Sequence, residues 1–136
     1  MIIIVDSDGF IGNLDPQDMH HSNTQKISTR LVKNGATLIY PATVIVETVT
    51  FLQGRLNSPE LANQVIRLVN DGQLTIEPVD IEIIQKASLF MDFKKSKHNT
   101  LFDAVVAAIA QKYQADAIFS FDKFYKSKGF KLASEL

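Results

Sequence analysis

Residues 1–6, MIIIVD, decide how the rest of this 136-residue chain is interpreted. Ile2 to Val5 form an unbroken β-branched run, without the polar residue at every second position that marks a half-exposed strand. Such a run is typical of a strand buried on both faces, as in a parallel sheet covered by helices. We therefore predict a buried strand at residues 1–5, with Asp6 at its carboxyl end.

Strand and helix patterns alternate along the rest of the chain. Residues 43–56 fit two elements: their Val, Ile and Thr content favours a strand, whereas their length and the preceding Pro41 favour a helix, which we predict. In chain order, the other predicted elements are a helical turn at 9–14, a helix at 19–33, a strand at 36–40, a helix from 58 that ends at 71–72, a strand at 74–79, a helix from 80 to about 93, a helix at 100–113, a strand at 117–121 and a further candidate strand at 130–132.

Strands separated by helices predict one α/β domain over residues 1–136, a three-layer αβα sandwich with a central, mostly parallel sheet. In such sheets, ligand sites gather beyond the carboxyl ends of the strands. Asp6 and Asp122 follow predicted strands directly, so we expect them on adjacent or near-adjacent strands at one end of the sheet.

Composition limits the chemistry that is available. The chain has no cysteine, which excludes disulfides and thiolate metal sites and leaves oxygen or histidine ligands for any metal. The opening apolar run is too short for a signal peptide or a membrane span, so we expect a cytoplasmic protein. The net charge is -1, but residues 92–131 hold eight lysines against four aspartates. Charge alone favours a solvated lysine face over a phosphate-binding one.

Four carboxylates are candidates for a shared site. Alone, Asp6 and Asp122 have a simple explanation as turn or cap residues, and Asp103 follows Thr100 at the spacing of a capping box. Glu47 lies in an apolar run, where a charged residue is rarely buried without a partner. Four converging carboxylates would repel one another unless a cation such as Mg²⁺ or Mn²⁺ joined them. Such a cation can activate water and neutralise a phosphodiester transition state.

The order of these acids resembles the PIN domain family, in particular its VapC-type toxin branch. The resemblance covers the whole chain. It rests on Asp6 after the first strand, Glu47 in a helix after the second, the segment Thr100-Leu101-Phe102-Asp103-Ala104 with small residues after it, and Phe119-Ser120-Phe121-Asp122. It implies Mg²⁺- or Mn²⁺-dependent endoribonuclease activity of Asp6, Glu47, Asp103 and Asp122.

The resemblance also implies accessory residues and partners. Ser120 matches a family position where a hydroxyl supports the metal site, whereas Asp8 departs from the family and leaves open a fifth acid at the rim. Small toxins of this kind usually dimerise and are neutralised by an antitoxin peptide in the cleft, so we expect a homodimer with helices 44–56 and 61–69 as candidate interface. Lys123, Lys126 and Lys128 are candidates to hold the RNA backbone beside the acids.

Two other functions are compatible with parts of the sequence. Asp6-Ser7-Asp8-Gly9 resembles the nucleophile motif of haloacid dehalogenase-like phosphatases, with Asp6 as nucleophile and Asp8 as general acid, but Lys123 follows Asp122 where a second acid is expected. A catalytically silent PIN-like binding module is the other alternative, and four intact acids argue against it. We interpret His20, His21 and His98 as surface residues.

Overall fold

The computed structural model describes residues 1–94 and 98–136. Lys95 and Lys97 of the predicted basic segment therefore lie outside the described residues. In the described part of the chain, four parallel strands pair in the order β3-β2-β1-β4. They are β1 (Ile2–Val5), β2 (Thr37–Pro41), β3 (Thr75–Glu77) and β4 (Ala117–Phe119). The prediction of a parallel sheet, with the strand before Asp6 beside the strand before Asp122, is confirmed.

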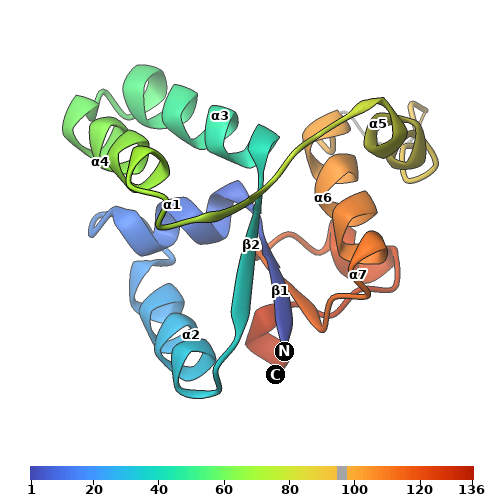
Figure 1. Ribbon diagram of the computed structural model, residues 1–136, viewed down its shortest axis with the longest axis horizontal. Coiled ribbons are helices and arrows are strands. Elements are labelled where there is room, and N and C mark those ends of the chain that lie inside the picture. Colours follow the sequence, from blue (N-terminus) through green and yellow to red (C-terminus); the bar gives the residue numbers. More distant parts are fainter. Residues whose placement is uncertain (95–97) are drawn as a thin grey trace.

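Helices cover both faces of this sheet, which confirms the predicted three-layer αβα sandwich. Figure 1 shows α1 to α4 on one side of the strands and α5 to α7 on the other. No helix in the described residues is long and apolar enough to cross a membrane. The helices are α1 (Ser7–Leu14), α2 (His21–Lys33), α3 (Ala42–Thr50), α4 (Pro59–Asn70), α5 (Ile81–Ser88), α6 (Leu101–Lys112) and α7 (Phe124–Ser127).

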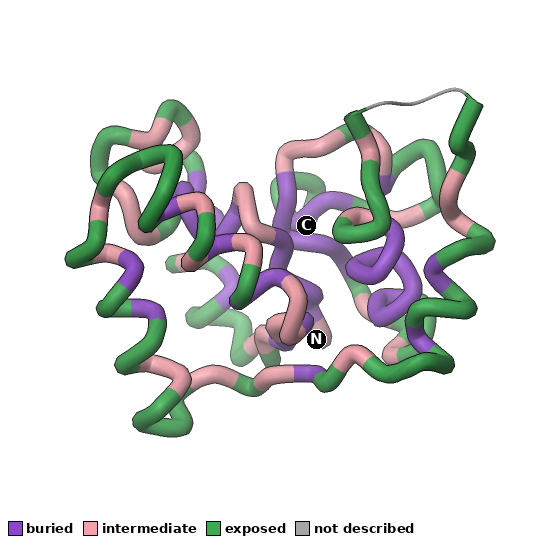
Figure 2. Tube along the Cα trace, turned by 90° about the horizontal axis from the view of Figure 1, so that it is seen from above, coloured by how far each residue is buried: buried purple, intermediate pink, exposed green. Residues whose placement is uncertain are grey.

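The core lies between β1 and the helices on its two faces. Ile3 and Ile4 are fully buried, as the unbroken apolar run predicts for a central strand. Helix α6 is buried along most of its length, because Ala104, Ala107 and Ala108 are small enough to let neighbouring elements approach closely. Figure 2 shows the buried residues of the trace gathered towards the centre of the molecule, with exposed residues on the outer helices.

Several predicted boundaries differ from the structure. Residues 43–56 are helical, as predicted, but α3 continues into a π-helical turn at Phe51–Arg55. The helix after Asp80 ends at Ser88, five residues earlier than predicted. The candidate strand at 130–132 was wrong: the chain turns at Gly129 (φ +90°) and enters a short 3₁₀ helix at Ala133–Glu135, which leaves one isolated bridge to β4.

The strand before Asp122 is also shorter than predicted, for a reason that concerns the site. Strand β4 ends at Phe119. Beyond it, the Phe121 amide donates to Asp8 Oδ2 (2.8 Å) and the Asp122 amide donates to Ser120 Oγ (3.1 Å). These backbone groups are satisfied by side chains instead of by a neighbouring strand, so the chain leaves the sheet as a polar turn.

Candidate active site

Asp6 lies at the junction between β1 and α1 and is 4% exposed. Its Oδ1 accepts a hydrogen bond from the Ser7 amide (2.8 Å), and its Oδ2 accepts one from the Tyr125 hydroxyl (2.7 Å). Gly9 allows α1 to start close to β4, since a Cβ there would lie 2.4 Å from the Phe119 carbonyl oxygen. The aspartate is thus held rigidly at the carboxyl end of the central strand.

Asp103 and Asp122 face this junction from α6 and from the turn after β4. Asp103 closes a capping box, in which its Oδ2 accepts from the Thr100 amide (2.8 Å). Asp122 accepts from the Phe124 amide at Oδ1 (2.8 Å) and from Asn99 Nδ2 at Oδ2 (2.9 Å). The cap roles expected for both residues are therefore present, and these hydrogen bonds fix the orientation of both carboxylates.

Glu47 reaches the same region from α3 and is half-buried. Burial raises the pKa of its carboxyl group, a hydrogen bond to Ser7 lowers it, and the charges of Asp103 and Asp8 raise it again. Glu47 is therefore near enough to Asp103 and Asp8 for their charges to act on it, and the hydrogen bond to Ser7 stabilises its carboxylate.

Asp8 is built into the site more firmly than its predicted place at the rim. Its Oδ1 accepts from the Gly9 amide (2.7 Å), and its Oδ2 accepts from Ser120 Oγ (3.0 Å) and from the Phe121 amide (2.8 Å). Ser120, which is 2% exposed, in turn accepts from the Asp122 amide. Asp8 and Ser120 thus connect the start of α1 with the turn that carries Asp122.

The carboxylates act on one another electrostatically. Burial is the main cause that raises the pKa of Asp6, followed by the charge of Asp8, with a smaller effect of Asp103. The pKa values of Asp8 and Asp103 are also raised, mainly by burial and further by the charge of Asp122. The structure therefore places the four predicted acids and Asp8 near enough for their charges to act on one another.

This cluster has the donor chemistry of a hard divalent cation. Carboxylate oxygens are the ligands that Mg²⁺ and Mn²⁺ prefer, and Mg²⁺ usually binds through one or two carboxylates while it keeps several waters. Among the described residues, however, no three acidic or histidine side chains are close enough together to hold one ion directly. Both carboxyl oxygens of Asp6 and of Asp122 accept hydrogen bonds within the protein. The cluster therefore fits an ion held by few direct carboxylates and by water.

Cavities lie beside the acids on several sides, and two of them adjoin Asp8 and the hydrogen-bond partners of Asp103 and Asp122. A cavity of about 260 Å³ lies beside Asp8 and Glu47 and is also lined by Asp18. A larger one, of about 530 Å³, is lined by Asn99 and Thr100, which bond to Asp122 and Asp103. The first opens between α1 and α3, and the second lies between α7 and the segments before and after residues 95–97.

The three predicted RNA-contacting lysines differ in their surroundings. Lys123 and Lys128 line the larger cavity, and the Lys128 ammonium lies 5.5 Å from the centre of the Phe124 ring. Lys126 instead forms an ion pair with Glu135 (2.9 Å). A contact of Lys126 with a phosphate would therefore compete with an existing partner.

His20 and His21 do not join the acid cluster. The His20 ring stacks on Phe121 with 4.0 Å between ring centres, and His21 Nδ1 lies 2.8 Å from the Gly12 carbonyl oxygen. Both side chains are half-buried, so the expectation that they are simple surface residues was incomplete. His98 is exposed, as expected.

The sequence interpretation missed three residues that shape the site: Tyr125, Asn99 and Asp18. Tyr125 is fully buried and bonds to Asp6, and Asn99 bonds to Asp122. Asp18 lines the smaller cavity and caps the turn before α2 by accepting from the His20 amide (2.8 Å). Only Asp18 has a visible signal in the sequence, as an acid shortly after the Asp15-Pro16 turn.

The fold and the site together define a class of protein: parallel αβα sandwiches with acids gathered at the carboxyl ends of the strands. The model of the PIN domain matches residues 3–131, so the chain belongs to the PIN domain family. A search by sequence among curated proteins gives no match.

Solved structures show the same fold. One is VapC20 of Mycobacterium tuberculosis, a Sarcin-Ricin loop cleaving toxin, with a TM-score of 0.79, 19% identity, and 94% of this chain and 95% of that chain covered. Another is FitAcB of Neisseria gonorrhoeae, with a TM-score of 0.65, 16% identity, and 96% and 95% covered. At these identities the likeness concerns the fold.

Proposed function

We propose that this PIN domain is a Mg²⁺- or Mn²⁺-dependent endoribonuclease that uses Asp6, Glu47, Asp103 and Asp122. The observation that carries the proposal is the cluster itself: acids from four separate parts of the chain gather at the carboxyl ends of β1 and β4, where burial and then neighbouring acidic charges raise the pKa values of Asp6, Glu47 and Asp103. Such mutual repulsion is relieved by a bound divalent cation. The likeness to VapC20 makes RNA the substrate class to test first.

A bound cation would activate the attacking water and neutralise charge on the phosphodiester. The residues of the chain hold and orient the carboxylates around it. Tyr125 fixes one oxygen of Asp6, Asn99 fixes one of Asp122, and the capping box fixes Asp103. Groups oriented in this way need little reorganisation during the reaction. No histidine or serine nucleophile is required.

Lysines beside the acids provide the contacts for the RNA backbone. Lys123 and Lys128 line the cavity next to Asn99 and Thr100, and within the part of the chain that the structure describes Lys126, unlike them, forms an ion pair with Glu135. Cations that neutralise phosphates give an affinity that falls as salt rises. We infer a cytoplasmic protein, since that is where its RNA substrate would be.

We further infer that the chain is the toxin of a toxin–antitoxin pair and forms a homodimer. Support comes from the VapC20 and FitAcB folds and from exposed apolar side chains on the predicted interface helices, among them Val46 (63% exposed) and Ile66 (41%). Light scattering at micromolar concentration tests the dimer, with Val46→Lys as the variant expected to dissociate it. A monomeric wild-type protein would remove this part of the proposal.

The alternatives predict different activities. The family assignment favours the nuclease over a haloacid dehalogenase-like phosphatase. Asp8 also bonds to Ser120 and Phe121 within the protein, which is a poor position for a general acid.

The test is a substrate panel with Mn²⁺ or with EDTA: an unstructured RNA, a folded RNA, the matching DNA and p-nitrophenyl phosphate. We expect cleavage of RNA that needs Mn²⁺. Hydrolysis of p-nitrophenyl phosphate alone would favour the phosphatase, and no hydrolysis of any substrate would favour the silent binding module.

A further inference from the structure

The cavity of about 530 Å³ beside Asp103 and Asp122 is lined by the two lysines proposed above to contact the RNA backbone, but its aromatic side chains have no role in that proposal. Two of its lining residues bond directly to those acids: Asn99 donates to Asp122 Oδ2 (2.9 Å), and the Thr100 amide donates to Asp103 Oδ2 (2.8 Å). A ligand that contacts Asn99 or Thr100 in this cavity would therefore contact a direct hydrogen-bond partner of Asp122 or Asp103. Its volume lies within the range of pockets that hold small ligands.

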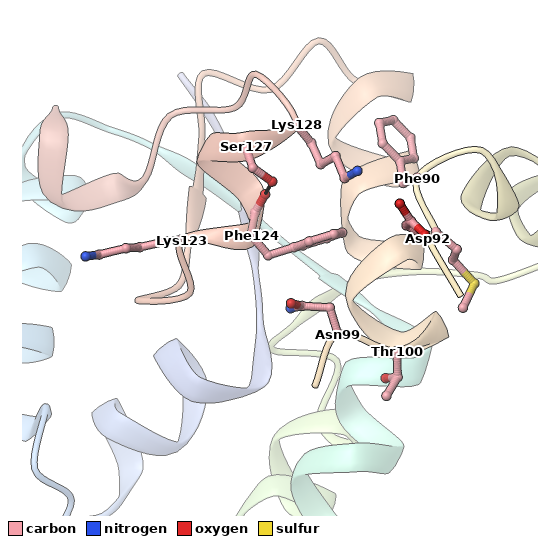
Figure 3. Close-up of a pocket in the computed structure, with 9 residues that line it drawn as sticks. Phe90, Asp92, Asn99, Thr100, Lys123, Phe124, Ser127 and Lys128 are labelled. Carbon is pink, nitrogen blue, oxygen red and sulfur yellow. Dashed lines mark hydrogen bonds between the residues drawn. The ribbon is translucent and has the colours of Figure 1, made fainter. Parts of the chain in front are cut away.

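The lining combines aromatic faces with two lysines, Lys123 and Lys128, and one acid, Asp92. Figure 3 shows the Phe124 ring extending into the space between α7 and the segment that carries Phe90 and Asp92, while Lys128 approaches from the side of α7. The Lys128 ammonium is 5.5 Å from the centre of the Phe124 ring. Lys123 also belongs to the lining but extends away from the other labelled side chains. Phe90 and Phe124 are both partly exposed.

An aromatic face with a cation next to it matches the two parts of a nucleotide, its base and its phosphate. Bases stack on phenylalanine rings whatever their sequence, and lysines bind the phosphates. A purely apolar ligand would make no polar contact with Lys128 or Asn99. A free anion would not stack on the phenylalanine rings. The cavity also adjoins the place where the proposed reaction would hold a phosphodiester.

We propose that this cavity is a subsite for one unpaired nucleotide of an RNA chain, with its base on Phe124 and its phosphate near Lys128. The inference rests on the proposed ribonuclease function and adds which residues bind one nucleotide of the substrate. The protein should then prefer RNA in which the nucleotide next to the cleaved bond is unpaired or can unpair, since proteins read RNA mainly through unpaired bases.

The test measures binding in EDTA, where cleavage does not interfere. Full-length protein labelled with ¹⁵N is titrated with AMP, UMP, ribose 5-phosphate and a short single-stranded RNA, and amide shifts are followed by NMR. We expect AMP and UMP to shift the amides of Phe124, Ser127 and Lys128, ribose 5-phosphate to bind more weakly, and the RNA to bind more tightly than either nucleotide.

Variants with matched controls separate the base contact from the phosphate contact. Phe124→Leu keeps an apolar side chain but removes the ring, and it should weaken AMP binding by at least about fivefold, the lower end of a base–aromatic stacking contribution. Phe93→Leu is its control, because Phe93 is 82% exposed and does not line the cavity. Lys128→Gln should weaken AMP and ribose 5-phosphate alike, and its control is the exposed Lys131→Gln.

Three results would overturn the proposal: AMP causes no shifts in the lining residues, Phe124→Leu behaves like Phe93→Leu, or RNA binds no more tightly than AMP. If the wild-type protein still cleaves RNA with Mn²⁺ in any of these cases, the subsite is wrong and the nuclease function stands. Nucleotide binding in the cavity by a protein that cleaves no RNA would support the subsite and contradict the nuclease function.

Discussion

The buried hydroxyl of Tyr125 donates a hydrogen bond of 2.7 Å to Asp6 Oδ2, although the two residues are 119 positions apart in the chain. This contact fastens the short helix α7 to the end of the central strand. Burial is the main cause that raises the pKa of Asp6, and the Tyr125 hydrogen bond opposes that rise because it stabilises the carboxylate. Tyr125 therefore orients Asp6 and also favours its ionised form.

Tyr125→Phe should weaken the proposed metal site without unfolding the protein. The pKa of Asp6 rises further when the hydrogen bond is lost, so the acid limb of the cleavage profile should move to higher pH and more Mn²⁺ should be needed for half-maximal rate. A buried acceptor left unpaired costs about 1–3 kcal/mol of stability. Rates measured between pH 5 and 9 over a Mn²⁺ series check this.

The matched control is Tyr113→Phe. The Tyr113 hydroxyl also donates to a carboxylate, Glu77, but this pair joins the C-cap of α6 to the edge strand β3. Its loss should lower stability and leave the pH profile and the Mn²⁺ dependence unchanged. Equal shifts of the pH profile in both variants would show that Tyr125 acts only through stability.

The metal-free protein should become less stable as pH rises above the ordinary carboxyl pKa values. Asp6, Asp8, Glu47 and Asp103 have folded pKa values above the ordinary 3.8 or 4.5. Their contribution is full below the ordinary pKa and is lost as pH rises through the raised folded pKa. Glu77 and Glu135 have lowered pKa values, so their contribution is lost only under more acidic conditions.

Thermal unfolding in EDTA and in Mn²⁺ measures this dependence. Mn²⁺ should raise the melting temperature more at pH 8 than at pH 5, on the order of 5–10 °C at about 100 times its dissociation constant. A melting temperature in EDTA that climbs steadily from pH 5 to pH 8 would speak against carboxylates that repel one another.

Asp8 should act through position rather than charge. Its Oδ2 accepts from Ser120 Oγ and the Phe121 amide, and an asparagine keeps an oxygen that can accept both bonds, at the cost of the bond from the Gly9 amide to Oδ1. We expect Asp8→Ala to lower the cleavage rate about 10–100-fold, as loss of a residue that orients a ligand typically does. Asp8→Asn should lose less than about fivefold. An equally inactive Asp8→Asn would mean that the negative charge itself is needed.

RNA affinity should depend on salt through Lys123 and Lys128. Each phosphate contact that is lost lowers the salt slope of single-stranded RNA binding by about 0.7. Lys123→Gln and Lys128→Gln should each reduce the slope by about this amount. Lys126→Gln should change it less, because Lys126 already pairs with Glu135. Anisotropy titrations at several salt concentrations give the slopes, and an unchanged slope in both of the first two variants would remove the lysines from the RNA path.

The elements that follow local patterns could be predicted from sequence. The unbroken run at residues 1–5 requires burial on both faces, and β1 is indeed central. Asp6, Glu47, Asp103 and Asp122 could be singled out because three of them stand at predicted element ends and one interrupts an apolar run. The order of the elements then implied that they meet at one end of the sheet.

The contacts that refine the site depend on residues far apart in the chain. Nothing around Tyr125 distinguishes it from an ordinary core aromatic, since its partner Asp6 is 119 positions away. The early end of β4 depends likewise on Asp8, which takes the Phe121 amide. Helix α5 was predicted too long because apolar Leu89 and Phe93 continued its pattern, whereas both are more than 80% exposed in the structure.

The most direct test of the four-carboxylate mechanism compares the wild-type protein with Asp103→Asn on one unstructured RNA in Mn²⁺. Asparagine keeps the size of Asp103 and removes the charge that would hold the cation. Circular dichroism establishes that both proteins are folded, and His98→Ala serves as an exposed control that should cleave normally. We predict that Asp103→Asn cleaves at least about 100-fold more slowly than the wild type. Cleavage by folded Asp103→Asn at the wild-type rate would contradict the mechanism.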